Sequence, residues 1–407
     1  MNNSKILVIS YYFPPYKKVG GRRWAKHCKY LNRLGIETHV LSCQFPESTS
    51  SWDKDVLEYE KFVTRIKVPE SKILYFKKTL PTSVAQKIRW KLSLWSHKVK
   101  TLFSNTSTKI SENTAPYFFK AATVIIEREV INAVILSIGP YKYSEVIVPL
   151  KLKFPNVKFI LDDRDYWNEE FEKLPIKEKV IEQDFQKKVI SQVGLIISPY
   201  IEMKKRYEAS FNKDVYWLPH CVDMEEIPTY KPIEKKSVVT MIYGGAFYKE
   251  IDSSIDLIKK CVDVLTHHTK VEVEFYVSIK GYEKELEHPF IKRYDFIDSH
   301  EYFLKVQKSN YVILILPPNR VNAMSSKFFE LVAMRKPILY FGGEGDVADY
   351  LISNHLGYHV TKENINSISI EIFNNIETKQ VPDMNFDISM HSFEYQTKLL
   401  ASKIESL

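Results

Sequence analysis

The 407-residue sequence has few cysteines and no long apolar run. Its four cysteines lie far apart, form no CxxC pair and fall in apolar periodic segments, so we expect buried thiols rather than disulfides or a zinc site. No apolar run approaches the ~20 residues of a membrane-spanning helix, and the stretch MNNSKILVIS turns polar too early for a signal peptide. We therefore expect a cytoplasmic protein, either soluble or held peripherally at the inner face of the cell membrane. The cysteines are Cys28, Cys43, Cys221 and Cys261.

Several common catalytic motifs are also absent. The sequence contains no GxGxxG dinucleotide fingerprint, which disfavours a nicotinamide enzyme, and it has neither a GxSxG nucleophile motif nor a phosphate-binding P-loop. No group of His, Asp and Glu residues has metal-ligand spacing in the sequence, so neither a metal nor another cofactor is expected. His220 could act as a ligand or a base, but we favour a hinge or core histidine.

The composition is that of a globular protein with two domains. The chain has 44% hydrophobic and 27% charged residues, as folded proteins do, and it is too long for one ordinary core. The net charge of +8 is mild for this length. It suits a protein that handles anions or touches an acidic membrane, and it does not demand a nucleic-acid partner.

Short β-rich runs alternate with helical patterns, which predicts α/β domains with doubly wound parallel sheets. A first series of strands is expected at Lys5–Ser10, Thr38–Ser42, Ala133–Ser137, Lys158–Leu161, Gly194–Ser198 and Val215–Leu218. A second series is expected at Val238–Tyr243, Val271–Val277, Ile291–Phe296, Tyr311–Leu316 and Ile338–Phe341. We predict one Rossmann-like domain over residues 1–222 and another over 223–388. A last helix over 389–407 could dock on either domain, including back on the N-terminal one.

Ligands of open parallel sheets bind beyond the carboxyl ends of the strands, so the loops there should carry the chemistry. Gly20-Gly21 precedes a helix, where the backbone can approach a ligand; an ordinary turn is the alternative. Asp162–Trp167 (DDRDYW) could orient a sugar hydroxyl, bind a metal or serve in acid–base chemistry. Its alternative is a salt bridge from Arg164 that pins the loop. Gly139–Tyr143 (GPYKY) should lie on the same edge.

The second domain has a glycine loop and a helix start of the same kind. Gly244–Lys249 (GGAFYK) offers flexible backbone and one cation to a diphosphate. Ser325–Leu339 (SSKFFELVAMRKPIL) begins a helix whose unpaired N–H groups suit a phosphate, and Glu330 could accept hydrogen bonds from two sugar hydroxyls. The alternative is a plain helix start, with Ser326 as N-cap and Glu330 as a solvated acid that complements the helix dipole.

The segment 72–103 interleaves basic and aromatic residues and has no acidic residue. As a helix it would align Ile88, Leu92, Trp95 and Val99 in one apolar stripe flanked by lysines. That pattern fits an interfacial helix on an anionic membrane. The alternative is a solvated helix that packs its stripe on the first domain.

Nearly the whole chain resembles bacterial glycosyltransferases of the retaining family 4, which have the two-Rossmann-domain glycosyltransferase-B (GT-B) fold. The block KILVISYYFPPYKKVGGRRWAKHCKYLNRLG is similar to the family's first strand, glycine loop and first helix. ILDDRDYWNEE is similar to a D-x-R-D-x-W pattern found in a subset of members. SSKFFELVAMRKPIL resembles the donor-binding helix, K-x-x-E-x-x-A-x-x-K-P.

The resemblance implies a hexosyltransferase that moves a sugar, with retention, from a nucleoside-diphosphate donor to a glycan or lipid-linked acceptor. The product would be a bacterial surface polysaccharide such as capsule or O-antigen. The resemblance maps Glu330 to the family's ribose-holding glutamate, and lysines with helix termini would stabilise the leaving phosphate without a metal. The expected donor-binding residues are Gly20, Gly21, Gly245, Ser326, Lys327 and Glu330; the acceptor-binding residues Tyr141, Asp162 and Trp167; and the catalytic residues Arg164, Asp165 and Lys249.

The sequence departs from the family pattern at several positions. Asn322 stands where the first acid of the family's acidic pair is expected, and no catalytic histidine is evident near Asp162. His220-Cys221-Val222-Asp223 replaces the common Asn-Gly-Val-Asp. Two alternatives therefore stay open: a nucleotide-sugar epimerase of the same fold, and a catalytically silent subunit that binds nucleotide or glycan.

Overall fold

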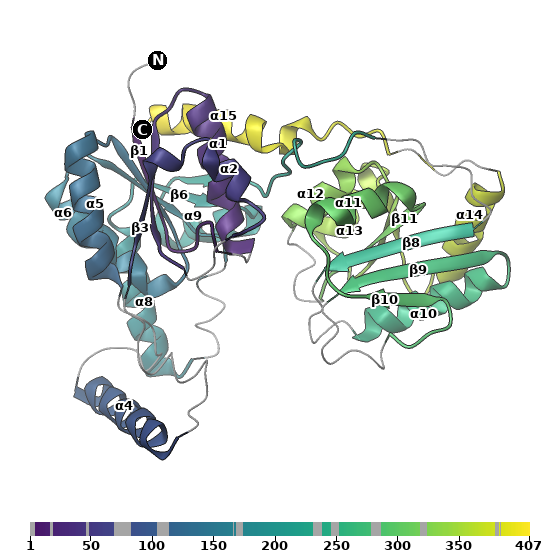
Figure 1. The fold of residues 1–407 in the computed structure, drawn as a ribbon, viewed down its shortest axis with the longest axis horizontal. Coiled ribbons are helices and arrows are strands. Elements are labelled where there is room, and N and C mark those ends of the chain that lie inside the picture. The colour runs from purple at the N-terminus through teal and green to yellow at the C-terminus, as the bar shows by residue number, and fades with distance from the viewer. Residues whose placement is uncertain are drawn as a thin grey trace. The chain divides into compact units, whose positions relative to one another are not determined.

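The chain divides into two units, each built around a parallel sheet (Figure 1). The structure is a computed structural model that describes residues 5–16, 19–45, 49–68, 83–103, 114–165, 167, 174–230, 238–245, 252–277, 286–317, 324–378, 382 and 384–407. Unit 1 consists of Met1–Pro219 with Thr397–Leu407, and unit 2 of His220–Gln396. The boundary between the units therefore follows Pro219, three residues before the boundary after residue 222 that the sequence predicts.

Among the described residues of unit 1, seven strands form a parallel sheet in the order β3-β2-β1-β4-β5-β6-β7. The central strand is β1, in which Ile6 pairs with Thr38 on one side and Ala133 on the other. The strands are β1 Ile6–Ser10, β2 Thr38–Cys43, β3 Val63–Ile66, β4 Ala133–Ser137, β5 Lys158–Asp162, β6 Leu195–Ser198 and β7 Val215–Trp217. The edge strand β3 is half-buried, and the sequence analysis does not predict it.

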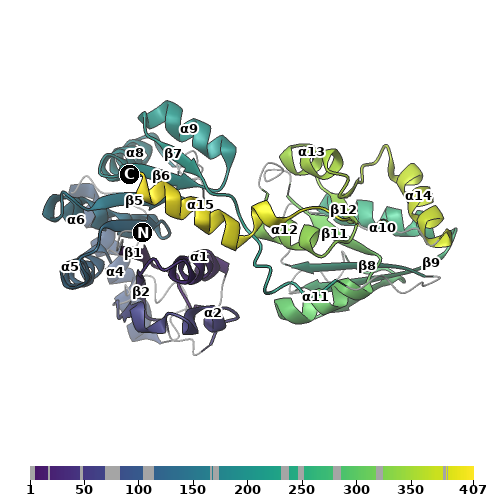
Figure 2. The ribbon, with the colours of Figure 1, turned by 90° about the horizontal axis from the view of Figure 1, so that it is seen from above.

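Helices cover both faces of this sheet (Figure 2). The helices of this unit are α1 Arg22–Arg33, α2 Asp53–Leu57, α4 Val84–Phe103, α5 Ala115–Glu129, α6 Ile147–Lys153, α8 Ile176–Ile190, α9 Ile201–Phe211 and the end of α15 Phe393–Glu405, with 3-10 helices η1 Val19–Gly21, η2 Glu60–Phe62 and η3 Tyr141–Val146. No described side chain of α4 belongs to the apolar clusters on either face of the sheet. Because successive strand residues point to opposite faces, Leu7 packs with α5, α6, α8 and α9, whereas Val8 packs with α1, α2 and α15. Leu400 and Ile404 of α15 lie in the second cluster, so the end of the C-terminal helix packs on unit 1.

Unit 2 repeats this plan with six strands among its described residues, in the order β10-β9-β8-β11-β12-β13. The strands are β8 Val238–Gly245, β9 Lys270–Val277, β10 Ile291–Tyr294, β11 Tyr311–Ile315, β12 Ile338–Phe341 and β13 Gly357–His359. The helices are α10 Asp252–Thr266, α11 Ser299–Lys308, α12 Ser326–Ala333, α13 Asp346–Ser353, α14 Ile365–Glu377 and the 3-10 helix η5 Ser389–His391. Met241 packs with α10 and α14 on one face, and Ile242 packs with α11, α12 and α13 on the other.

Three expectations from the sequence can be checked against these elements. The four cysteines are buried free thiols, as predicted. Within the described ranges, no helix combines the length and the hydropathy that crossing a membrane requires. The N-cap of α12 is Ser325, whose Oγ accepts a hydrogen bond from the Phe328 N–H at 3.4 Å. The choice of Ser326 as N-cap is wrong by one residue, because the backbone is still extended at Ser325.

Candidate active site

Three loops predicted to carry chemistry meet at the carboxyl edge of the unit 1 sheet. The Nη1 of Arg164 donates a hydrogen bond to the Gly20 carbonyl at 2.7 Å. Its Nη2 lies 3.6 Å from where a Cβ on Gly139 would stand, and Gly139 has a φ of +126° that favours glycine. The Tyr141 hydroxyl donates to the Asp165 carbonyl at 2.9 Å. The expectation that these loops share one edge is confirmed, and Arg164 is the residue that joins them.

Asp162, the last residue of β5, lies beneath this edge and connects β5 to α1 and β4. Its carboxylate is fully buried. Oδ2 accepts hydrogen bonds from Trp24 Nε1 at 2.7 Å and Ser137 Oγ at 3.0 Å, while Oδ1 lies 3.4 Å from Nε of Arg23. The prediction that Asp162 binds an acceptor does not fit this geometry, because a buried carboxylate with three partners inside the unit presents no atom to an acceptor. Asp162 instead anchors α1 to β4 and β5.

The neighbouring carboxyl group, on Asp163, points to the other face of the sheet. It accepts a hydrogen bond from the hydroxyl of Tyr207 in α9, and this hydroxyl also accepts from Nε2 of Gln186 in α8 at 3.3 Å. Burial raises the pKa of Asp163 to about 8, against the lowering effect of the Tyr207 hydrogen bond. A carboxyl group turned inward and protonated at neutral pH is a poor metal ligand, so Asp163 does not fit the metal site that is one expectation for the Asp162–Trp167 loop.

An aromatic stack supports the outer part of the loop. Trp167 is 1% exposed, and its ring stacks on Tyr141 with centroids 5.1 Å apart and planes 19° apart. The Trp167 ring also lies 5.8 Å, centroid to centroid, from the ring of Phe185 in α8. Contact between Trp167 and an acceptor, as predicted, does not fit this burial. Half-buried Tyr141 and Arg164 and exposed Asp165 are among the described side chains of this loop edge that a ligand can reach.

Gly20 and Gly21 form part of η1 and lead directly into α1. A Cβ on Gly21 would stand 3.4 Å from the Tyr16 carbonyl oxygen, so the chain is tightly folded here. The first turn of α1 contains no acidic residue, and no side chain caps it. No side chain therefore caps the first N–H groups of α1. An anion site at a helix N-terminus requires such uncapped N–H groups.

Unit 2 has a candidate site of its own at the end of β8. The ammonium of Lys327, in the first turn of α12, lies 4.1 Å from the centroid of the Tyr243 ring. It also lies 2.8 Å from where a Cβ on Gly245 would stand, and Gly245 has a φ of +148°. Next to it, a Cβ on Gly244 would stand 2.4 Å from Cε2 of Tyr302. The Gly-Gly pair is therefore needed so that a cation and an aromatic ring can approach the backbone.

Lys327 is electrostatically unusual. Desolvation lowers its pKa to about 8, although the charge of Glu330 acts in the opposite direction. Within the described part of the chain, no carboxylate forms an ion pair with Lys327, and the contact with Tyr243 is a cation–π interaction. Ser326 and Glu330 are half-buried on the same helix. Gly245 and Lys327, both expected as donor-binding residues, thus lie next to each other, whereas Lys249 and Asn322 lie outside the described residues.

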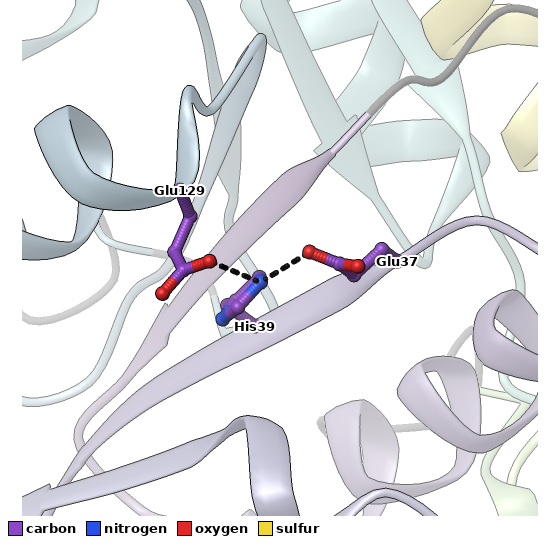
Figure 3. Close-up of side chains that lie close together, drawn as sticks. All are labelled: Glu37, His39 and Glu129. Carbon is purple, nitrogen blue, oxygen red and sulfur yellow. Dashed lines mark hydrogen bonds and ion pairs between the residues drawn. The ribbon is translucent and has the colours of Figure 1, made fainter.

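Sequence reasoning missed Tyr243, Tyr302 and Tyr207, because no local pattern marks a tyrosine that will cover a lysine, a glycine or an acid. It also missed a polar cluster at the opposite, amino-terminal edge of the unit 1 sheet (Figure 3). There His39 Nε2 lies 2.9 Å from Glu37 Oε1 and 3.9 Å from Glu129 Oε2.

This cluster has the residue types of a metal site, with ligand atoms within 4.8 Å of one another. However, the ammonium of Lys5 lies 2.6 Å from Glu37 and 4.0 Å from Glu129. Lys5, followed by His39, lowers the pKa of Glu37. Because Lys5 already supplies the positive charge, we interpret the cluster as an ion-pair network that ties the start of β1 to β2 and α5.

Comparison with known proteins identifies the fold. No protein-family profile and no curated protein sequence matches this chain. Sucrose-phosphate synthase from Thermosynechococcus elongatus has a TM-score of 0.64 at 10% identity, over 99% of this chain and 98% of that one. The E. coli trehalose-6-phosphate structure bound with UDP-2-fluoro glucose has a TM-score of 0.59 at 9% identity, over 99% of both chains. A protein described as UDP-N-acetylglucosamine 2-epimerase from Listeria monocytogenes has a TM-score of 0.54 at 11% identity, over 99% and 96%.

At such low identity these likenesses show the fold alone. Their coverage of nearly the whole chain, together with two parallel sheets flanked by helices, confirms the predicted α/β class and the GT-B fold. The fold is one on which both glycosyltransferases and nucleotide-sugar epimerases are built, so the chemistry has to be argued from the site.

Proposed function

We propose that this protein is a glycosyltransferase that moves a sugar from a nucleoside-diphosphate donor to a glycan or lipid-linked acceptor. The observation that carries the proposal is the position of Lys327, a desolvated ammonium beside Gly245 at the carboxyl end of β8. A diphosphate is the ligand chemistry that best suits a half-buried, partly desolvated cation beside glycine backbone and a helix N-terminus. The shared fold with a sucrose-phosphate synthase and with a protein bound to UDP-2-fluoro glucose supports this proposal.

In the proposed complex unit 2 binds most of the donor. Lys327 and the first N–H groups of α12 contact the diphosphate, with Ser326 beside them. Glu330, one turn further along α12, accepts hydrogen bonds from the ribose hydroxyls. Lys249 is proposed to contribute to the same diphosphate, and the Gly20-Gly21 turn of unit 1 stays a proposed donor-binding element. This charge would come from lysines and helix N-termini, so we propose that the reaction needs no metal.

During transfer the bond from the anomeric carbon to the diphosphate oxygen breaks, and a bond to an acceptor hydroxyl oxygen forms. The leaving diphosphate gains negative charge, which Lys327 and the helix N-H groups stabilise. The proton of the acceptor hydroxyl passes to the departing phosphate, and the configuration is retained. Arg164, Asp165 and Tyr141 are proposed to face the acceptor or the transferred sugar, since their side chains are accessible at the described part of the unit 1 loop edge.

Donor binding is tested first, by a thermal-shift screen of nucleoside diphosphates, because a ligand that binds the folded state raises the midpoint by mass action. Transfer is then assayed with labelled nucleotide sugars and glycan or lipid-linked acceptors. Analysis of the anomeric configuration of the product tests retention. The product's role in a surface polysaccharide, our proposal for the pathway, is tested by deleting the gene and analysing cell-surface glycans.

Lys327→Met should reduce transfer by about 10²–10³-fold, the usual cost of losing one preorganised charge donor. Lys362→Met is the matched control, because Lys362 is exposed and lies elsewhere on unit 2, and it should leave transfer unchanged. Glu330→Ala should weaken donor binding, whereas Glu330→Gln, which keeps one acceptor oxygen, should weaken it less. Full donor affinity and full activity in Glu330→Ala would refute the assignment of the donor site.

The likeness to an epimerase makes isomerisation of the donor the second candidate function. Incubation with donor alone separates the two: an isomeric nucleotide sugar formed without acceptor indicates an epimerase. Nucleotide or glycan binding without transfer, isomerisation or donor hydrolysis indicates a silent binding subunit, the alternative raised by Asn322.

A further inference from the structure

Helix α4 leaves an apolar stripe exposed to solvent (the helix is labelled in Figure 1). Val84, Ile88, Leu92 and Trp95 are 74%, 54%, 59% and 66% exposed. At ~100° per residue these four positions fall within an arc of about 80°. None of them belongs to a hydrophobic cluster of the described residues. The alternative expected from the sequence, a stripe that packs on the first domain, is therefore not what the described residues show.

Basic side chains flank this stripe on both sides. Lys87 and Lys91 are exposed on one flank, and Arg89 is exposed on the other. The whole helix, VAQKIRWKLSLWSHKVKTLF, contains five Lys and Arg residues and no Asp or Glu. Long basic side chains beside an apolar stripe can bury their methylene groups along apolar surface while the charges stay in a polar layer.

This combination identifies the partner chemistry. A second copy of the chain would bring two α4 helices, each basic and without an acid, into contact, so like charges would oppose self-association. A nucleic acid would match the charge but would leave the aliphatic stripe in water. An anionic bilayer matches both, because acyl chains receive the stripe, headgroups receive Lys and Arg, and Trp95 suits the interface between them.

We propose that α4 lies in the headgroup region of an anionic lipid bilayer and holds the protein at its surface, with Leu92 and Trp95 inserted toward the acyl chains. The proposal concerns binding and does not rest on the proposed transferase activity. Its test therefore needs no substrate, and its failure would leave the transferase proposal untouched.

The full-length protein should bind vesicles containing roughly one third phosphatidylserine and should not bind vesicles of phosphatidylcholine alone. Binding should weaken as salt is raised toward ~0.5 M, since screening reduces the electrostatic part. Sedimentation with vesicles gives the affinity. Tryptophan emission should shift to the blue on binding, and Trp95→Phe should remove most of that shift.

Two variants separate the apolar and the basic contributions. Leu92→Gln with Trp95→Gln should lose about tenfold or more in vesicle affinity, and so should Lys87→Gln with Arg89→Gln and Lys91→Gln. The matched controls are Ile176→Gln, an 84% exposed apolar residue of α8, and Lys177→Gln with Lys187→Gln and Lys205→Gln, three exposed lysines outside α4. The controls should bind like the unaltered protein.

Three results would overturn the proposal. The first is no binding to anionic vesicles, and the second is equal loss of binding in the α4 variants and the controls. The third is a dimer, seen by light scattering, that Trp95→Gln dissociates, because a second copy would then cover the stripe.

Discussion

Replacing Asp163 by asparagine should stabilise unit 1 at neutral and alkaline pH. Burial raises the pKa of the Asp163 carboxyl from 3.8 to about 8. The folded protein therefore keeps a proton that the unfolded chain releases, and this group's contribution to stability is complete below pH 3.8 and is lost as the pH rises through about 8. An asparagine amide has the shape of the protonated acid and no proton to lose, so Asp163→Asn removes this pH dependence.

The size of the effect follows from the shift. One pKa unit corresponds to ~1.4 kcal/mol, so a change from 3.8 to about 8 corresponds to about 6 kcal/mol. The stability advantage of the variant should be near zero around pH 4 and should reach its full value near pH 8. Because other titrating groups are the same in both proteins, the difference between them isolates Asp163.

Denaturant unfolding from pH 5 to pH 9, followed by tryptophan fluorescence, measures this difference. All six tryptophans lie in the sequence range of unit 1, so the signal reports that unit: Trp24, Trp52, Trp90, Trp95, Trp167 and Trp217. Tyr207→Phe serves as a second variant. It removes the hydroxyl that favours the ionised carboxylate, so its pH dependence should extend to more alkaline pH. A stability difference between Asp163→Asn and the unaltered protein that does not change with pH would refute the reasoning.

Two further substitutions test the packing around the sites. Gly244→Ala should destabilise unit 2 by roughly 1–3 kcal/mol, because the new Cβ would stand 2.4 Å from Cε2 of buried Tyr302. Gly194→Ala is its control, because a Cβ there meets no atom within 4 Å. Equal melting curves of the two variants by circular dichroism would contradict the prediction. Asp55→Asn should destabilise unit 1 by about 3 kcal/mol or more, because the ammonium groups of Lys26 and Lys29 are buried at 2.7 and 3.0 Å from this carboxylate. Asp256→Asn, at an exposed position, should cost little, and a similar loss in both variants would count against an ion-pair effect.

The strands show how far the sequence predicts the fold. β1 and β11 are five-residue runs of buried side chains, mostly Ile, Val and Leu. Such a continuous apolar run is typical of a strand that helices cover on both faces, and the sequence predicts both strands. The missed strands, β3 and β13, lie at sheet edges and are half-buried. An edge strand pairs with one neighbouring strand instead of two, and its side chains are less buried. Its sequence therefore needs fewer apolar residues, and the hydrophobic pattern that would predict it is weaker.

Helix α12, the proposed donor-binding helix, shows the same limit for single contacts. The sequence predicts that a glycine pair after β8 and a lysine at the start of α12 belong to one binding edge, because strand ends of a parallel sheet share an edge. It does not predict that the lysine lies on Tyr243, or that Tyr302 covers Gly244. Those contacts depend on how α11 and α12 pack, and no pattern within a single helix encodes that packing.

The sequence by itself determined the fold class, the buried thiols and the shared edge of the Gly20, Gly139 and Arg164 loops, since strand and helix periodicities and turn residues are local properties. The tertiary structure alone decided what each acid of Asp162-Asp163-Arg164-Asp165 does. Because side chains alternate between the two faces of the sheet, Asp162 accepts a hydrogen bond from Trp24, 138 positions away, and Asp163 accepts one from Tyr207, 44 positions away. Asp165 is exposed. Adjacent, chemically identical residues thus differ in role because their partners come from opposite faces of the sheet.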